Sequence, residues 1–130
     1  MYRKIILSLI FASMWFTNSV VAHEMTPTYP VLKPSFMNGI YTTEMQMFNT
    51  REEVEYYEID VLDSEFYTIP FATKHKVMNV GYLSHVKFDV YIRDQDVDRA
   101  VYICTTSRLK KDAGKNTMIT TKICSKFAQR

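Results

Sequence analysis

The chain is poor in the residues on which many recognisable sites depend. Its 130 residues include three glycines, two cysteines and three histidines. With so few glycines, the sequence has no glycine-rich loop to hold a phosphate, and its cysteines do not form a CxxC redox motif. Zinc-ligand spacing is absent, and Ser, His and Asp occur without a nucleophile motif. These absences argue against the common catalytic classes, and we expect a protein that is not an enzyme.

Long apolar runs are also missing, except at the start of the chain. Arg3 and Lys4 precede an apolar run from Ile5 to Phe16, and Val20-Val21-Ala22 follows as a cleavage signal. This run is shorter than the roughly 20 residues that cross a bilayer as a helix. We therefore predict a cleaved signal peptide at residues 1–22 and a periplasmic or secreted domain at residues 23–130. An uncleaved membrane anchor is the alternative.

Removing the signal peptide changes the charge balance. Two of the 16 Lys and Arg residues leave with it, so the mature chain carries 14 basic and 14 acidic residues. A net charge near zero removes the argument for nucleic-acid binding. Residues 23–98 hold 13 acidic and 6 basic residues, whereas residues 99–130 hold 8 basic residues and one acidic residue. The basic C-terminal part either complements its acidic neighbours or faces an anionic partner.

The mature chain shows the alternation of β-strands and no helical period. The pattern is clearest from His85 to Arg93, where every second residue is apolar. Strands are predicted at residues 40–48, 54–62, 68–71, 85–93, 100–109 and 117–127, with turns at 49–53 and a polar connection at 94–98. Segment 68–71 is expected at a sheet edge, because Pro70 lacks a ladder donor. About 108 residues with this pattern predict one all-β domain, a two-sheet antiparallel sandwich.

Cys104 and Cys124 lie symmetrically about Gly114. If the last two strands form a hairpin around this glycine, Cys104 opposes Cys124, within disulfide reach. An exported chain passes through an oxidising compartment, so we predict one disulfide between them, with free thiols as the alternative. The even-numbered face, which carries both cysteines, is expected to be the outer one. The odd-numbered face of this hairpin is expected to face the core. In this register Tyr102 opposes Lys126 and Leu109 opposes Ile119.

A succession of strand motifs runs through the chain. The motifs are Tyr29-Pro30-Val31-Leu32-Lys33, Met45-Gln46-Met47-Phe48-Asn49-Thr50, Tyr57-Glu58-Ile59-Asp60-Val61, Ile69-Pro70-Phe71, Val86-Lys87-Phe88-Asp89-Val90-Tyr91-Ile92-Arg93 and Ala100-Val101-Tyr102-Ile103-Cys104. Together they resemble the N-terminal immunoglobulin-like domain of periplasmic pilus chaperones, over most of residues 25–127. The resemblance implies a single immunoglobulin-like antiparallel β-sandwich of about seven strands. Some members of that family also join their last two strands by a disulfide.

The resemblance also implies a function. In that family the last strand of the domain completes a pilin subunit by β-strand addition, and basic residues hold the subunit's C-terminal carboxylate. It implies here a protein-binding domain whose partner is a pilin-like or assembly subunit. Matched by position, Ile119 and Ile123 would be inserted into the partner, and Lys122 or Lys126 would anchor it. A structural component of a surface or virion assembly, using the same edge, is the alternative.

A second alternative starts from His23. Cleavage after Ala22 would place a free amine and an imidazole on one residue, and together these two nitrogens chelate copper. A third nitrogen would come from His75 or His85. The sequence therefore leaves copper binding at His23 open, and it gives no sign of another cofactor.

Overall fold

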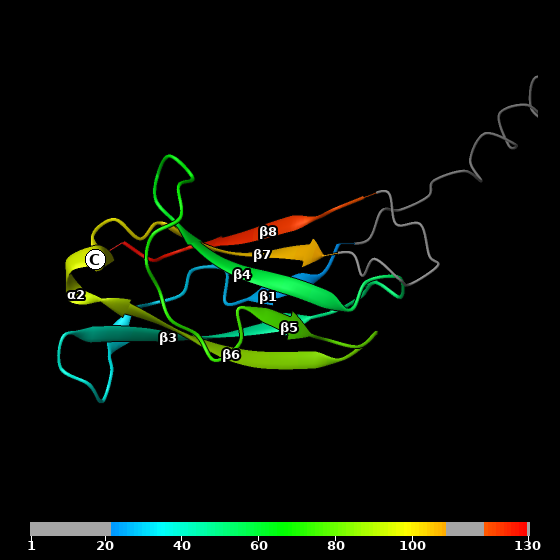
Figure 1. The fold of residues 1–130 in the computed structure, drawn as a ribbon, viewed down its shortest axis with the longest axis horizontal. Helices are drawn as coiled ribbons and strands as arrows, with labels where there is room; N and C mark the ends of the chain where they lie inside the picture. The colour runs from blue at the N-terminus through cyan, green and yellow to red at the C-terminus, as the bar shows by residue number, and fades with distance from the viewer. Residues whose placement is uncertain (1–21, 109–118, 130) are drawn as a thin grey trace, which may run out of the picture.

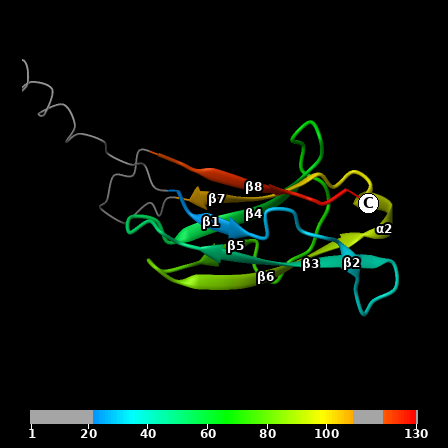
Figure 2. The same ribbon diagram turned by 180° about the vertical axis from the view of Figure 1, so that it is seen from behind.

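The computed structural model describes residues 22–108 and 119–129. They form two antiparallel sheets packed face to face, seen from opposite sides in Figures 1 and 2. The all-β sandwich predicted from the sequence is thereby confirmed. The predicted signal peptide up to residue 21, the turn at Gly114 and the Leu109 pairing lie outside the described residues. Within the described ranges, no helix is long and apolar enough to span a membrane.

The first sheet is built around a central strand, β3 (Ile40–Phe48). One side of β3 pairs along its whole length with β6 (His85–Arg93), and the other side pairs with β1 (Glu24–Thr26) and β2 (Lys33–Pro34). The second sheet has the order β5 (Val77–Asn79), β4 (Tyr56–Leu62), β7 (Tyr102–Arg108) and β8 (Lys122–Lys126). Strand β8 is therefore one margin of the second sheet and β5 is the other.

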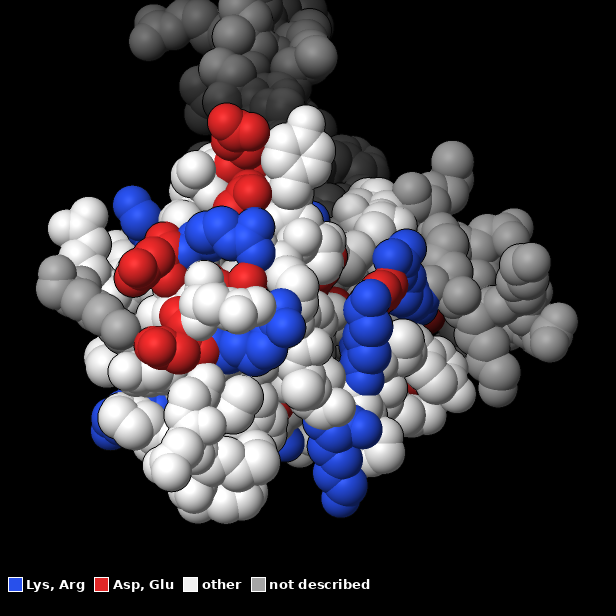
Figure 3. Space-filling model, turned by 60° about the vertical axis from the view of Figure 1, so that its left-hand side comes forward, with Lys and Arg blue, Asp and Glu red and all other residues white. Residues whose placement is uncertain are grey.

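A short helix, α2 (Asp94–Val97), links β6 to the segment before β7, where the sequence predicted a polar connection. Asp96 is buried in this helix and accepts hydrogen bonds from Arg99 and Arg93. These hydrogen bonds hold the pKa of the Asp96 carboxyl below its usual value, and the one from Arg99 contributes most. Figure 3 brings this end of the molecule forward and shows acidic and basic side chains side by side on it. At this end, Asp96 forms ion pairs with both Arg93 and Arg99.

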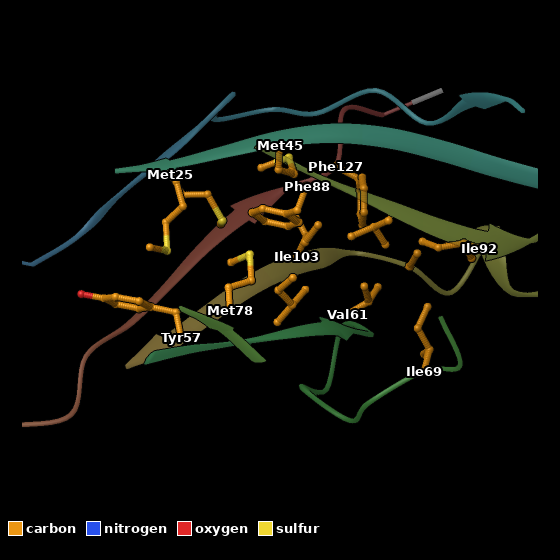
Figure 4. Packing of buried hydrophobic residues seen from close by; sticks show 14 of the residues in the cluster. Met25, Met45, Tyr57, Val61, Ile69, Met78, Phe88, Ile92, Ile103 and Phe127 are labelled. Atoms are coloured by element: carbon orange, nitrogen blue, oxygen red, sulfur yellow. The ribbon is translucent and has the colours of Figure 1, made fainter. Parts of the chain in front are cut away.

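The core lies between the two sheets and comes from the alternating residues of the long strands (Figure 4). In β6, Phe88, Val90 and Ile92 point inward, as the sequence pattern predicts. The inward side chains of the two sheets are buried against one another. This burial stabilises the fold by about 25 cal/mol for each Å² of apolar surface removed from water. The fully buried members with large side chains include Met45, Met47, Tyr57, Ile59, Val61, Ile92 and Ile103.

The shortest elements depart from the prediction. Segment 68–71 is not a strand: it makes an isolated bridge from Thr68 to Leu62, and Ala72 makes another to Tyr91. The chain crosses between the sheets here, so Pro70 does not sit in a ladder. Strand β5 and the two-residue β2 were not predicted as separate strands, because so few residues carry no visible period.

The last two strands pair in the predicted register. Tyr102 opposes Lys126, and Cys104 opposes Cys124 with a disulfide between them. The expected outer placement of the bridge holds for Cys124, which is exposed, but not for Cys104, which is fully buried. Cys104 lies in β7, whose neighbours β4 and β8 cover it from both sides. Placing Ile119 in the core was also wrong, since this side chain is 46% exposed.

Candidate protein-binding edge

Strand β8 forms an open margin of the second sheet. The Phe127 N–H donates to the Val101 carbonyl, and the Ser107 N–H donates to the Thr121 carbonyl, each at 2.9 Å. Since bonding residues alternate along an antiparallel strand, the odd-numbered residues of β8 bond to β7. The backbone groups of Lys122, Cys124 and Lys126 therefore point away from β7. We call these outward backbone groups the β8 edge.

Among the described residues, no backbone hydrogen bond is made to the β8 edge itself. Beyond its end, the Ala128 N–H donates to the Pro30 carbonyl at 2.9 Å. Strand β1 of the first sheet passes close to β8, but no backbone hydrogen bond joins these two strands in the described part of the chain. An unpaired row of N–H and C=O groups is a template for an added strand.

The predicted partner-binding side chains lie on this strand and the segment before it, but on two faces. Lys122 and Lys126 are exposed on the outer face beside Cys124. Ile123 points inward and packs in part against the core, whereas Ile119 is exposed ahead of the strand. Ile123 thus already has a packing role within its own domain. Contact of these four residues with a partner stays a prediction.

The turn at residues 49–53 buries two polar side chains, Asn49 and Arg51, which the sequence did not reveal. The Asn49 side-chain amide donates to the Val54 and Val80 carbonyls, at 2.7 and 2.8 Å. Its oxygen accepts from the Arg51 N–H and from the Tyr57 hydroxyl, at 2.8 and 2.6 Å. Burial raises the pKa of Tyr57 to about 12, so this phenol stays protonated and donates. These bonds fold the turn inward and bring Arg51 beneath the start of β8.

Arg51 connects this turn to the segment that leads into β8. Its guanidinium is only 4% exposed and pairs with Glu53 at 2.7 Å. It also donates to the Ile119 carbonyl at 3.0 Å and to the Thr121 hydroxyl at 3.2 Å. A buried cation of this kind is tolerated only when it is paired and fully hydrogen-bonded. Arg51 therefore fixes the backbone from which β8 starts.

His23 is buried beside the same residues. Its Nε2 lies 2.7 Å from the Thr105 hydroxyl oxygen and 3.2 Å from the Thr105 carbonyl, and its Nδ1 lies 3.3 Å from the Thr121 hydroxyl. The ring also packs against Tyr57, with ring centres 4.6 Å apart. The pKa of His23 is lowered to about 4: burial is the main cause, the hydrogen bond to the Thr105 backbone opposes it, and the charge of Arg51 adds to the lowering. The imidazole is therefore neutral at neutral pH.

This position does not fit the copper hypothesis. Both ring nitrogens of His23 already have threonine partners, and His85 shares a hydrogen bond with Gln46. In residues 22–108 and 119–129, no three His, Cys, Asp or Glu side chains are grouped so that they could hold a metal ion. The structure instead gives His23 a place in the packing between the sheets.

Comparison with known proteins bears on the fold. No protein-family model and no curated protein sequence matches the chain. Among solved structures, the chain is similar to the E. coli chaperone DraB, with 12% identity and a TM-score of 0.61 over 82% of this chain and 53% of DraB. The chain thus spans about half the length of DraB. A FixG-related protein from Vibrio parahaemolyticus matches with 13% identity and a TM-score of 0.47, over 85% of this chain and 99% of that one. The likeness to DraB confirms the predicted resemblance to pilus chaperones as a similarity of fold: the chain is an immunoglobulin-like, chaperone-like β-sandwich.

Proposed function

We propose that this chain is an exported, non-enzymatic domain that binds another protein by β-strand addition at the β8 edge. The observation that carries the proposal is that the backbone of Lys122, Cys124 and Lys126, at the margin of the second sheet, has no strand partner among the described residues. Strand addition uses such groups for affinity and the flanking side chains for specificity. The similarity of fold to a chaperone agrees with a partner that is itself a protein, such as a pilin-like or assembly subunit.

The β8 edge is held in place before any partner arrives. The disulfide ties Cys124 to Cys104 of β7, and Arg51 holds the Ile119 carbonyl just before the strand. A binding strand that is already ordered does not lose that conformational entropy on association. The edge therefore has the rigidity that a template for another strand requires.

The charge beside the β8 edge indicates the kind of partner. Lys122 and Lys126 are exposed on one face, and neither forms an ion pair within the described residues. Unpaired lysines on a binding strand attract acidic side chains or a carboxylate terminus and speed association. We infer that the partner presents negative charge next to the strand that it adds.

Site-specific crosslinking tests the proposal. A photoreactive residue is placed at Lys122 or Lys126 in the exported protein, and at Glu44 on the exposed outer face of β3 as a matched control. We expect one partner to be captured from positions 122 and 126 and not from 44. Replacing the other lysine by glutamate should weaken that capture several-fold. Equal capture from all three positions, or capture that ignores charge reversal, would contradict the proposal.

Amide hydrogen exchange checks the binding mode with the captured partner. Before binding, the amides of Lys122, Cys124 and Lys126 should exchange faster than those of Ile123 and Ser125, which bond to β7. Strand addition should slow the first group and leave the second unchanged. Protection confined to side-chain surfaces elsewhere would show that the partner binds, but not through the β8 edge.

A further inference from the structure

The other side of the sandwich, between β5 and β6, is also open. Strand β6 pairs with β3 along one side. On its other side, Tyr91 alone is bonded among the residues that the structure describes, exchanging hydrogen bonds with Ala72 at 2.8 and 2.9 Å. After Ala72 the chain leaves the margin of β6 and joins the second sheet as β5. Because Tyr91 bonds outward, Lys87 and Asp89 direct their backbone groups to the same side. Within the described ranges, no backbone group pairs with them.

A groove of about 580 Å³ lies beside this open margin. Segment 73–79 forms one wall, and β6 from Val86 to Tyr91 forms the other. Its apolar lining comes from Met78 and Phe88, which belong to the core, together with Val77, which is 50% exposed, and the partly buried Val86. The groove thus combines a free strand edge with exposed apolar surface, at the position where a further strand of the first sheet would lie.

The charges that line the groove are mainly positive. Lys74, His75 and Lys87 line it, and Asp89 is the one carboxylate among the described lining residues. Lys87 pairs with Glu44 at 3.4 Å, but both side chains are exposed to solvent, so this pair is weak. Lys74 forms no ion pair with any described residue. This lining favours an acidic occupant and disfavours the basic β8 of a second copy.

We propose that the β5–β6 groove binds an extended, acidic segment of another protein as an added strand beside β6. Apolar side chains at alternate positions of that segment would enter the groove against Met78 and Phe88. The residues between them would be acidic and would face Lys87 and Lys74 across the strand pair. This second binding site is independent of the β8 edge and does not require it to act.

A short synthetic peptide in which valine and glutamate alternate is the probe. Binding is measured by fluorescence anisotropy and located by amide hydrogen exchange. We expect it to slow exchange at the Lys87 and Asp89 amides and not at Lys122 or Lys126. Two control peptides should each bind at least about tenfold more weakly. In the first, of equal length, lysine replaces glutamate; the second keeps the valine and glutamate composition but groups the two residue types in separate blocks.

Protein variants complete the test. Lys74→Glu and Lys87→Gln should each weaken binding of the valine–glutamate peptide several-fold, since both side chains are exposed and neither change disturbs the core. Lys33→Glu, at an exposed position on β2 across β3 from β6, is the control and should leave binding unchanged. Methylating the peptide nitrogens on the side that faces β6 should abolish binding, whereas methylating the other side should not. Equal binding of the acidic and basic peptides, or protection at the β8 edge instead, would overturn the proposal while leaving the proposed function untouched.

Discussion

At the scale of single residues, the polar side chains of His23 and Arg51 are buried where the two sheets meet below β8. Both are held by hydrogen bonds to segments far away in the sequence, such as Thr105 and Thr121. Their burial depends on these distant contacts and not on the pattern of apolar and polar residues next to them in the sequence. The sequence therefore predicted the turn at 49–53 and offered His23 as a ligand, and only the fold shows that Asn49, Arg51 and His23 are buried.

The lowered pKa of His23 makes the stability of the domain depend on pH. The folded state holds the neutral imidazole, so its stabilising effect is complete above the unfolded pKa of 6.5 and is lost as pH falls toward about 4. The loss should be on the order of 2 kcal/mol, measured by urea unfolding at pH 7 and pH 4.5. The variant His23→Gln should lose less over this interval. Equal losses in both proteins would show that His23 does not titrate in this way.

Arg51 should matter more to stability than an exposed arginine does. Arg51→Met would remove the ion pair with Glu53 and the hydrogen bond to the Ile119 carbonyl, at a cost of about 3 kcal/mol. Arg108→Met is the matched control: it removes an exposed pair with Glu58 and should cost less than about 1 kcal/mol. Urea midpoints of the two variants provide the comparison. Similar midpoints would argue against a structural role for the Arg51 contacts.

At the scale of elements, strand length decides how much the sequence predicts. Strands β3 and β6 have nine residues each, and their alternation predicted both bounds and inward faces. The symmetry of Cys104 and Cys124 likewise predicted the β7–β8 register and the outer placement of Lys122 and Lys126. The resemblance led us to expect an edge at the last strand, but the open margin of β6 could not be predicted, because the order of strands in a sheet depends on which distant segments meet. The β5–β6 groove depends on such an order.

The disulfide should stabilise β8 in particular. Its cysteines are 20 residues apart in sequence, and a loop of this size corresponds to about 3 kcal/mol of stabilisation by chain entropy. Reduction should lower the urea midpoint and speed amide exchange at Ile123 and Ser125, which pair with β7. The double variant Cys104→Ala, Cys124→Ala should show the lower midpoint with or without reductant. An unchanged midpoint on reduction would mean that the β7–β8 ladder alone holds the strand.

At the scale of the whole molecule, the two open margins lie on opposite sides of the sandwich. Strands β4 and β7 separate the β8 edge from β5 and its groove. Saturating the groove with the valine–glutamate peptide should therefore leave crosslinking from position 122 unchanged. A fall in crosslinking, with the Lys122, Cys124 and Lys126 amides still unprotected by the peptide, would show that the two sites are coupled through the sheets.

Export makes a further prediction for the whole chain. Intact mass spectrometry of the protein recovered outside the cytoplasm should give the mass of residues 23–130, with two hydrogens gained on reduction of the disulfide. Retention of residues 1–22 would contradict cleavage after Ala22. Free thiols in the recovered protein would contradict passage through an oxidising compartment.

The bond between Cys104 and Cys124 also decides how the domain would respond to mechanical load. A partner strand held at the β8 edge would pull on β8, and in an ordinary sheet such tension can peel the outer strand from its neighbour. Here a covalent link joins the outer strand to β7 at the middle of β8. Under tension the hydrogen-bonded contact with the partner would break before that link, so the domain would release its partner and keep its own fold.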